Sequence, residues 1–412
     1  MPPKRLLKEY GNRISNLLTV SEMVLNQAAR EGNIHIIGFL FDSLKVADHE
    51  DTLTTLLLAQ DKDKQTAWHL AVLWGNIEVL QKLWEWAENI LWSSQINNTY
   101  LLAKDMRNMT AWHVAAEEGN IKILQQLWKW AEERLTCEEL NNSLLLAKDS
   151  RGKIVWHMAA KSGNTEVLEK IWEYAEERLT PEDLKNKLLL ATDNLRQTAW
   201  HYATWEGNIY LLQKLWDLAK EILPEEDLSN KWLLAKNKRG QTAWHMATER
   251  GNLELLEKLW EWAREIQTPE DLNSKSMLET DNRERTAWHL AAEFGKLKLL
   301  QKQWEWAKEV LTAEEINDNL LLAGDDNEQT FLHVAAKSTT TSEFEEVWDW
   351  ATNNLPKEEI KNLLLARDDH EHTVWNLVEN RSDTEFLNKM WDWARHFLTP
   401  EEIRTVFDQR RK

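Results

Sequence analysis

Histidine recurs at a fixed spacing in this sequence, and histidine can bind a metal or carry a proton near neutral pH. Seven copies stand 44 residues apart: His69, His113, His157, His201, His245, His289 and His333. A metal site needs ligands that converge to about 2 Å from one ion. Equivalent residues of stacked helix pairs lie roughly 8–10 Å apart. We therefore expect these histidines to be structural and not to share a metal ion.

Paired carboxylates, which could supply a general acid and a base, also recur. Examples are Glu182-Asp183, Glu225-Glu226 and Glu270-Asp271. A glycosidase uses one such pair, whereas acids repeated at helix starts complement helix dipoles. The sequence shows no phosphate-binding loop, nucleophile elbow or zinc-binding pair, and one cysteine, Cys137, cannot form an internal disulfide. We expect no catalytic residues, no enzyme activity, no metal and no cofactor.

The composition indicates a folded protein with an acidic surface. Of the 412 residues, 42% are hydrophobic and 25 are tryptophan, and the net charge is −19. Such acidity argues against nucleic acid or an anionic membrane as the partner, because phosphate binding needs a basic surface. We see no signal peptide and no membrane-spanning run, so we expect a cytoplasmic or nuclear protein.

An internal repeat dominates the chain, and three sets of residues mark it. The tetrad Thr66-Ala67-Trp68-His69 returns every 44 residues, in looser form at Ile154 and at Thr330, and its last copy, which begins at Thr373, comes one residue early. The first tryptophan ladder is Trp84, Trp128, Trp172, Trp216, Trp260, Trp304, Trp348 and Trp391. The second ladder, two residues later, is Trp86, Trp130, Tyr174, Leu218, Trp262, Trp306, Trp350 and Trp393.

Each repeat is predicted to contain three helices. In one repeat the first helix begins at Thr66, a capping residue, and stops at Gly75-Asn76. The second helix runs from Ile77 to about Leu91, with a wide apolar arc. A third helix is clearest from Thr180-Pro181 to Leu190-Ala191. Because the first ladder is tryptophan in every repeat and the second tolerates tyrosine and leucine, we expect the first to be buried and the second to be peripheral.

The repeat resembles the ankyrin repeat. The resemblance rests on the Thr-x-x-His start, the Ala-Ala near the end of the first helix, the Gly-Asn turn and the polar loop, and it is clearest over residues 237–252. The usual unit has 33 residues, so about 11 residues are added here, and they match the third helix. The longer unit looks like ankyrin arrays of insect type, and its regularity would also fit a sequence built toward a consensus.

The resemblance implies an all-α repeat solenoid of about nine units, each a helix-turn-helix pair plus an extra short helix, with short turns or hairpins between repeats. We expect one array: an N-terminal capping repeat over residues 1–60, regular repeats over 61–366 and a C-terminal capping repeat over 367–412. Capping repeats with a polar outer side are what such arrays need.

The resemblance also implies that a partner binds a concave face formed by loop tips and by residues late in the first helices. Those positions vary here while the framework repeats. Large aromatic residues and arginines are typical of binding hot spots, and an arginine row runs along the tips before they turn acidic. The partner-binding candidates are Trp74, Arg107, Arg151, Arg196, Trp205, Arg239, Arg250, Arg283 and Phe294.

The sequence therefore predicts a monomeric scaffold or inhibitor that binds another protein. A structural or self-assembling repeat protein is the alternative. The sequence does not name the partner.

Overall fold

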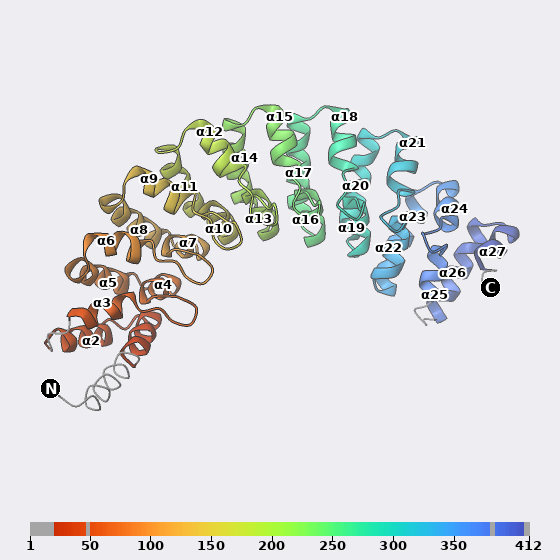
Figure 1. Cartoon of the computed structure of the whole chain (residues 1–412). Helices are drawn as coiled ribbons and strands as arrows, with labels where there is room; N and C mark the ends of the chain where they lie inside the picture. Colours follow the sequence, from red (N-terminus) through yellow and green to blue (C-terminus); the bar gives the residue numbers. More distant parts are fainter. Residues whose placement is uncertain (1–19, 47–49, 380–383, 408–412) are drawn as a thin grey trace. The chain divides into compact units, whose positions relative to one another are not determined.

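The structure, a computed structural model, describes residues 20–46, 50–379 and 384–407. Every regular element in these residues is a helix and none is a strand (Figure 1), so the prediction of an all-α chain is confirmed. The chain divides into two compact units, residues 1–203 with 213–215, and residues 204–212 with 216–412. The division passes through α13 (Ala199–Glu206) and α14 (Ile209–Ile222).

The first unit repeats one succession of elements: a short helix, a longer helix, a single helical turn and a π-helical segment. A helical segment over residues 20–31 comes first. The remaining elements are α2 (Ile34–Val46), α3 (Glu50–Leu58), α4 (Ala67–Leu73), α5 (Ile77–Ile90), α6 (Ser93–Gln95), η1 (Ile96–Leu101), α7 (Ala111–Glu117), α8 (Ile121–Arg134), α9 (Cys137–Glu139), η2 (Leu140–Leu145), α10 (Val155–Ser162), α11 (Thr165–Glu176), α12 (Pro181–Asp183) and η3 (Leu184–Leu189).

The second unit continues the same succession. Its elements are α15 (Glu225–Asp227), η4 (Leu228–Leu233), α16 (Ala243–Arg250), α17 (Leu253–Ile266), α18 (Pro269–Asp271), η5 (Leu272–Met277), α19 (Ala287–Glu293), α20 (Leu297–Val310), α21 (Ala313–Glu315), η6 (Ile316–Leu321), α22 (Phe331–Ser338), α23 (Thr341–Asn354), α24 (Lys357–Leu365), α25 (Val374–Glu379), α26 (Thr384–Phe397) and α27 (Pro400–Phe407). Within this unit α16, α19 and α22 lie side by side in one layer, and α17, α20 and α23 form a second layer (Figure 1).

The predicted bounds of the first two helices hold to within about two residues. Thr66 is the N-cap of α4, and α5 begins at Ile77 and ends at Ile90. The third helix begins as expected, with Thr180 capping α12 through a hydrogen bond to the N–H of Asp183 (3.2 Å). It then continues as a π-helix and not as the ordinary α-helix that we expected.

The π-helical segments explain the length of the repeat. Each 44-residue repeat contains one, and the single 43-residue repeat, from Thr330 to Thr373, has the continuous α-helix α24 instead. A π-bulge accommodates an extra residue by bonding residues five apart, as between the N–H of Leu190 and the carbonyl of Lys185 (2.9 Å). The forty-fourth residue is therefore the one that turns this helix from α to π.

We predict that deleting Lys187 converts η3 into a continuous α-helix. The deletion turns Leu-Lys-Asn-Lys-Leu into the pattern that α24 has at Ile360, and Lys187 is exposed. We expect a melting temperature within a few degrees of the parent, measured by circular dichroism. Deleting Glu173 inside α11 is the control. That deletion rotates the rest of the helix by about 100°, so it should lower the melting temperature much more. Equal losses in the two variants would contradict this interpretation of η3.

The second tryptophan ladder is more buried than predicted, because most of its rings pack against the first ladder of the preceding repeat. Trp84 stacks on Trp130 (centroids 4.8 Å apart, planes at 17°), and Trp260 stacks on Trp306 (4.9 Å, 16°). Four rings of the second ladder are buried and three are half-buried: Trp130, Trp262, Trp306 and Trp350, and then Trp86, Tyr174 and Trp393. The prediction of a peripheral second ladder is wrong for the four buried rings.

We predict that Trp216→Ala lowers the free energy of unfolding by about 3–5 kcal/mol, the usual cost of removing a large buried ring. Trp216 is 2% exposed and stacks on Trp262 at 5.3 Å. Urea unfolding followed by circular dichroism measures the change. Trp92→Ala is the matched control, because Trp92 is 79% exposed and its loss should change little. If both variants unfold like the parent, the stack does not stabilise the repeats.

The recurrent histidines form buried hydrogen bonds, which supports the structural role expected of them. Nδ1 of His157 accepts from the N–H of Ile154 (3.2 Å), so the ring proton lies on Nε2, which donates to the carbonyl of Ala191 (3.0 Å). His69, His113 and His289 bond in the same way to a carbonyl 34 residues later. Each ring therefore fastens the start of a first helix to the chain that leaves the π-segment.

We predict that acid weakens the fold through these rings. Burial lowers the pKa of His157 to about 4, whereas an unfolded histidine has a pKa of about 6.5. The unfolded chain therefore binds the extra proton first as pH falls from 6.5 to 4, and stability should fall by up to about 1.4 kcal/mol per pH unit for this ring.

The test compares the pH dependence of urea unfolding for the parent and for His157→Asn. The chain already uses asparagine in this position, where Oδ1 of Asn376 accepts from the N–H of Thr373 (2.9 Å). The variant should be less stable at pH 7, because it loses the bond to Ala191, but its curve should be flatter between pH 6.5 and 4. Parallel curves would show that His157 is not held neutral.

Candidate functional site

A tight loop precedes the first helix of each repeat, and an aspartate or asparagine closes it. In the loop over residues 281–285, Oδ1 of Asp281 accepts from the N–H groups of Arg283 (2.9 Å) and Arg285 (3.0 Å). The N–H of Asp281 donates to the carbonyl of Arg285 (3.0 Å). Glu284, the fourth loop residue, has a φ of +58°. The sharp turn leaves Asn282 and Arg283 exposed at the tip.

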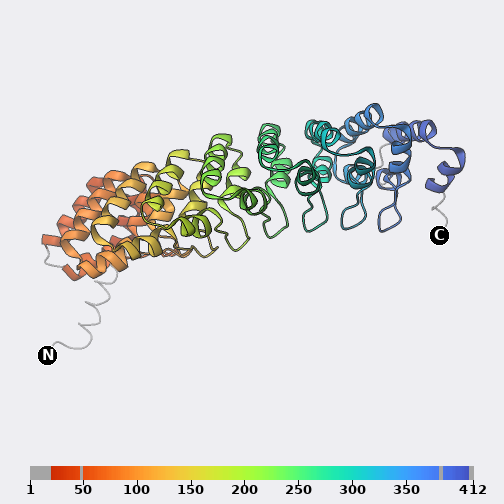
Figure 2. The ribbon, with the colours of Figure 1, turned by 90° about the horizontal axis from the view of Figure 1, so that it is seen from above.

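Backbone hydrogen bonds join neighbouring loops into a row. In the second unit the N–H of Asn282 donates to the carbonyl of Arg239 (2.9 Å), and the N–H of Asp326 donates to that of Arg283 (2.8 Å). The loops of this unit stand side by side along one edge (Figure 2). The third residues of successive loops therefore lie in a fixed order, and a side chain there has a defined neighbour.

The row corrects one predicted residue. Arg107, Arg151, Arg239 and Arg283 each occupy the third loop position, but Arg196 occupies the fourth, with a φ of +56°. Leu195 stands at the third position in that loop and is 53% exposed. Arg196 is therefore not part of the arginine row, because its loop places an apolar side chain there.

Two arginines of the first unit differ in their surroundings. Arg107 lies 3.5 Å from Asp105 and 3.3 Å from Glu117, and Glu117 also binds Lys161 at 2.7 Å. Its charge is thus compensated within the protein. Arg151 is exposed at its loop tip.

A buried lysine and a half-buried tyrosine lie beside that loop. The Nζ of Lys153 stands 4.4 Å from the ring centroid of Tyr202, whose hydroxyl donates to Asp193 (2.6 Å). Burial, together with this hydrogen bond, raises the pKa of Tyr202. Burial lowers the pKa of Lys153. These contacts hold the Tyr202 ring within the first unit, so Tyr202 is not an additional candidate for binding a partner.

The predicted aromatic residues are exposed. Trp74 is 61% exposed in the first unit, and Trp205 and Phe294 are 39% and 38% exposed in the second. The guanidinium carbon of Arg250 lies 4.6 Å from the ring centroid of Trp205, so these two candidates form a cation–π pair.

One cleft in the second unit brings three predicted residues together, and we name it the basic cleft. Its volume is about 460 Å³. It contains Arg239 and Arg283 from adjacent loop tips and Phe294 from the end of α19. The full set of lining residues is Lys238, Arg239, Gln241, Glu249, Asp281, Asn282, Arg283, Arg285, Leu290 and Phe294.

The carboxylates around the basic cleft already have partners. Arg285 binds Asp281 at 2.7 Å and Glu293 at 2.6 Å. Gln241 donates to Glu249 (3.2 Å). Although burial opposes ionisation of Asp281, hydrogen bonds from Arg285 and from the backbone hold its pKa below the usual value. The carboxylates of the basic cleft are therefore held by side chains of the protein itself.

Three cations of the basic cleft have no such partner. Among the residues that the structure describes, no carboxylate lies within ion-pair distance of Lys238, Arg239 or Arg283, and all three are exposed. The cleft thus presents uncompensated positive charge on a protein whose net charge is −19.

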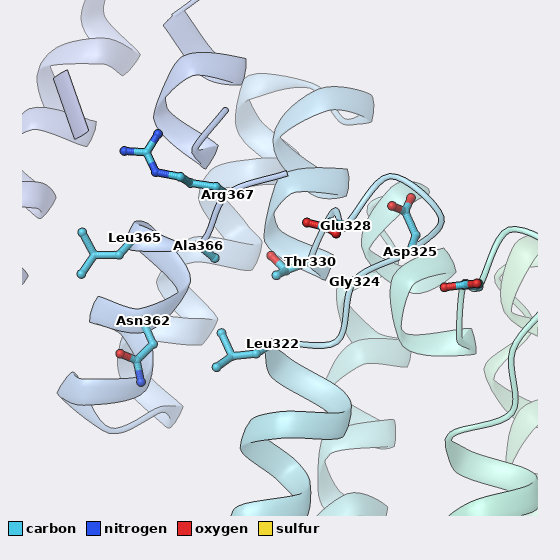
Figure 3. A pocket seen from close by; sticks show the side chains of 10 residues that line it. Leu322, Gly324, Asp325, Glu328, Thr330, Asn362, Leu365, Ala366 and Arg367 are labelled. Atoms are coloured by element: carbon cyan, nitrogen blue, oxygen red, sulfur yellow. The ribbon is translucent and has the colours of Figure 1, made fainter. Parts of the chain in front are cut away.

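A larger cleft of about 750 Å³ lies between the end of η6 and the end of α24, and Figure 3 shows its walls. None of the predicted partner-binding residues lines it. Its Arg367 donates to the carbonyl of Glu371 (2.9 Å), and Asp325 accepts from the N–H groups of Asn327 (3.0 Å) and Gln329 (2.9 Å). Two of its charged residues thus bond within their own loops, and the cleft contains no predicted residue, so it is the weaker candidate site.

Sequence reasoning missed Lys238 and the role of Arg285. Lys238 could have been found, since it precedes Arg239 and doubles the charge of that tip. That Arg285 pairs with both Asp281 and Glu293 depends on side-chain geometry, which the repeat pattern does not encode.

No group of three or more histidine, cysteine, aspartate or glutamate side chains is placed to hold a metal ion within the described ranges. No helix among those residues is long and apolar enough to cross a membrane. No protein-family model matches the chain, and no curated protein matches it significantly.

Proposed function

We propose that this chain is an ankyrin-type solenoid of about nine units, with the extra helix that the longer repeat adds, and that it binds another protein and is not an enzyme. The recurring helix pairs, the capped loops and the buried histidines support the ankyrin type. The partner binds along the loop tips and the ends of the first helices, where the residues vary from repeat to repeat.

The basic cleft is the observation that carries the proposal. It joins two arginines and a half-exposed phenylalanine, residue types that carry binding energy in protein interfaces. Adjacent loops hold the arginines in order through backbone hydrogen bonds, so little backbone conformational entropy is lost when a partner binds. Rigid recognition of this kind needs no catalytic group.

We predict that the double variant Arg239→Glu/Arg283→Glu loses proteins that the wild type captures from its source cell, as measured by affinity purification and mass spectrometry. Reversing both charges places acid against the binding surface of the partner. The expected result is a set of proteins that is captured by the wild type and absent with the variant.

The matched control is Lys231→Glu/Lys275→Glu. These lysines occupy equivalent positions in η4 and η5, where they pair with Asp227 and Asp271 at 2.8 Å, and their reversal changes the net charge equally. The control should retain the captured proteins. Capture that is identical for all three chains would show that the partner does not use the basic cleft.

A further inference from the structure

The charge of the basic cleft selects among partner chemistries. Elsewhere the protein is acidic, so a cationic partner is attracted to much of its surface and a polyanion is repelled. Around the basic cleft four cationic side chains face three carboxylates; Arg285 pairs with two of those carboxylates, while Lys238, Arg239 and Arg283 are in no ion pair within the described part of the chain. An acidic segment is therefore attracted to the basic cleft and repelled by the acidic surface around it. This contrast directs the segment to the cleft.

The donors of the cleft are fixed by the loops that present them. Gly240 has a φ of +75°, and a Cβ there would lie 2.6 Å from the backbone nitrogen of Asn282. The side chain of Asn282 also donates to the carbonyl of Lys238 (2.9 Å). This close approach locks two loop tips together, so Arg239 and Arg283 stand on one rigid support. Arginine can bind a carboxylate through two parallel hydrogen bonds.

An apolar wall completes the cleft. Phe294 caps the C-terminus of α19, where its N–H donates to the carbonyl of Leu290 (3.1 Å), and its side chain is 38% exposed. A purely ionic ligand would leave this ring in water. The cleft thus fits a ligand that carries both carboxylates and an apolar group.

We infer that the basic cleft binds an acidic segment of the partner protein, with carboxylates on Arg239 and Arg283 and an apolar side chain on Phe294. The inference rests on the proposed function and specifies its partner. One of the two corresponding arginines of the first unit, Arg107, pairs with Asp105 and Glu117, so its loop does not offer the same site.

The first experiment selects displayed random peptides on the wild-type chain and counter-selects on Arg239→Glu/Arg283→Glu. We expect the enriched peptides to carry aspartates or glutamates beside an apolar residue. They should also bind Lys231→Glu/Lys275→Glu. Enriched peptides that are neutral or basic would overturn the acidic segment and leave the binding function standing. If no peptide distinguishes the wild type from the double variant, the cleft is not the binding site.

The second experiment uses a fluorescently labelled peptide that has glutamates on both sides of a leucine. The protein is added to this peptide, and binding is measured by fluorescence anisotropy. Arg239→Glu and Arg283→Glu should each weaken binding about tenfold, and Phe294→Ala about fivefold. Added salt should weaken binding as well. The same peptide with lysines should show no binding that Arg239→Glu/Arg283→Glu abolishes, because any attraction it has is to the acidic surface elsewhere. No binding to the wild type, or displacement by millimolar inorganic phosphate, would overturn the inference, because the latter indicates a simple anion site.

Discussion

The contact on which this architecture depends is the stack between one indole and the ring 46 residues later. A single helix pair with a tetrad tryptophan cannot bury its apolar surface by itself. In each unit the first-ladder ring lies against its own tetrad tryptophan and against the next repeat, as Trp68, Trp84 and Trp130 show. Such a contact exists only when the neighbouring repeat is in place, so the stability of one repeat depends on the next.

The loops inherit their order from this packing. Once the helices are stacked, neighbouring loops come close enough for backbone hydrogen bonds, and the third loop residues form a row. Buried histidines reinforce that order, because His69, His113, His157 and His289 each fasten a helix start to the segment that leads into the next loop. Binding residues can therefore vary at the tips while the backbone that carries them stays the same. The basic cleft is one such variation on a constant support.

The repeat pattern predicted the helices and their caps, since caps such as Thr66 and turns such as Gly75-Asn76 act over a few residues. It did not predict the burial of Trp130 or Trp306, because their partners belong to the preceding repeat. Periodicity shows which residues share a helix face, but not which residues of another repeat that face contacts. It placed Arg239, Arg283 and Phe294 among the candidates but could not show that they share a cleft. It wrongly included Arg196 in the arginine row, because the row consists of third loop residues and Arg196 is a fourth loop residue. The neutralisation of Asp281 by Arg285 depends on side-chain conformation and could not be inferred.

The π-helical segments also have a consequence for how such repeats evolve. Because the extra residue is held in the π-segment and not in the loop, a repeat can lack it and still keep the bond between neighbouring loops, as Asp369 and Asn327 do across the 43-residue repeat. Repeats of 43 and 44 residues can then replace one another in the array. Recombination between repeats could reorder the binding residues while the joints between neighbours remain compatible, so new specificities could arise by shuffling as well as by point mutation.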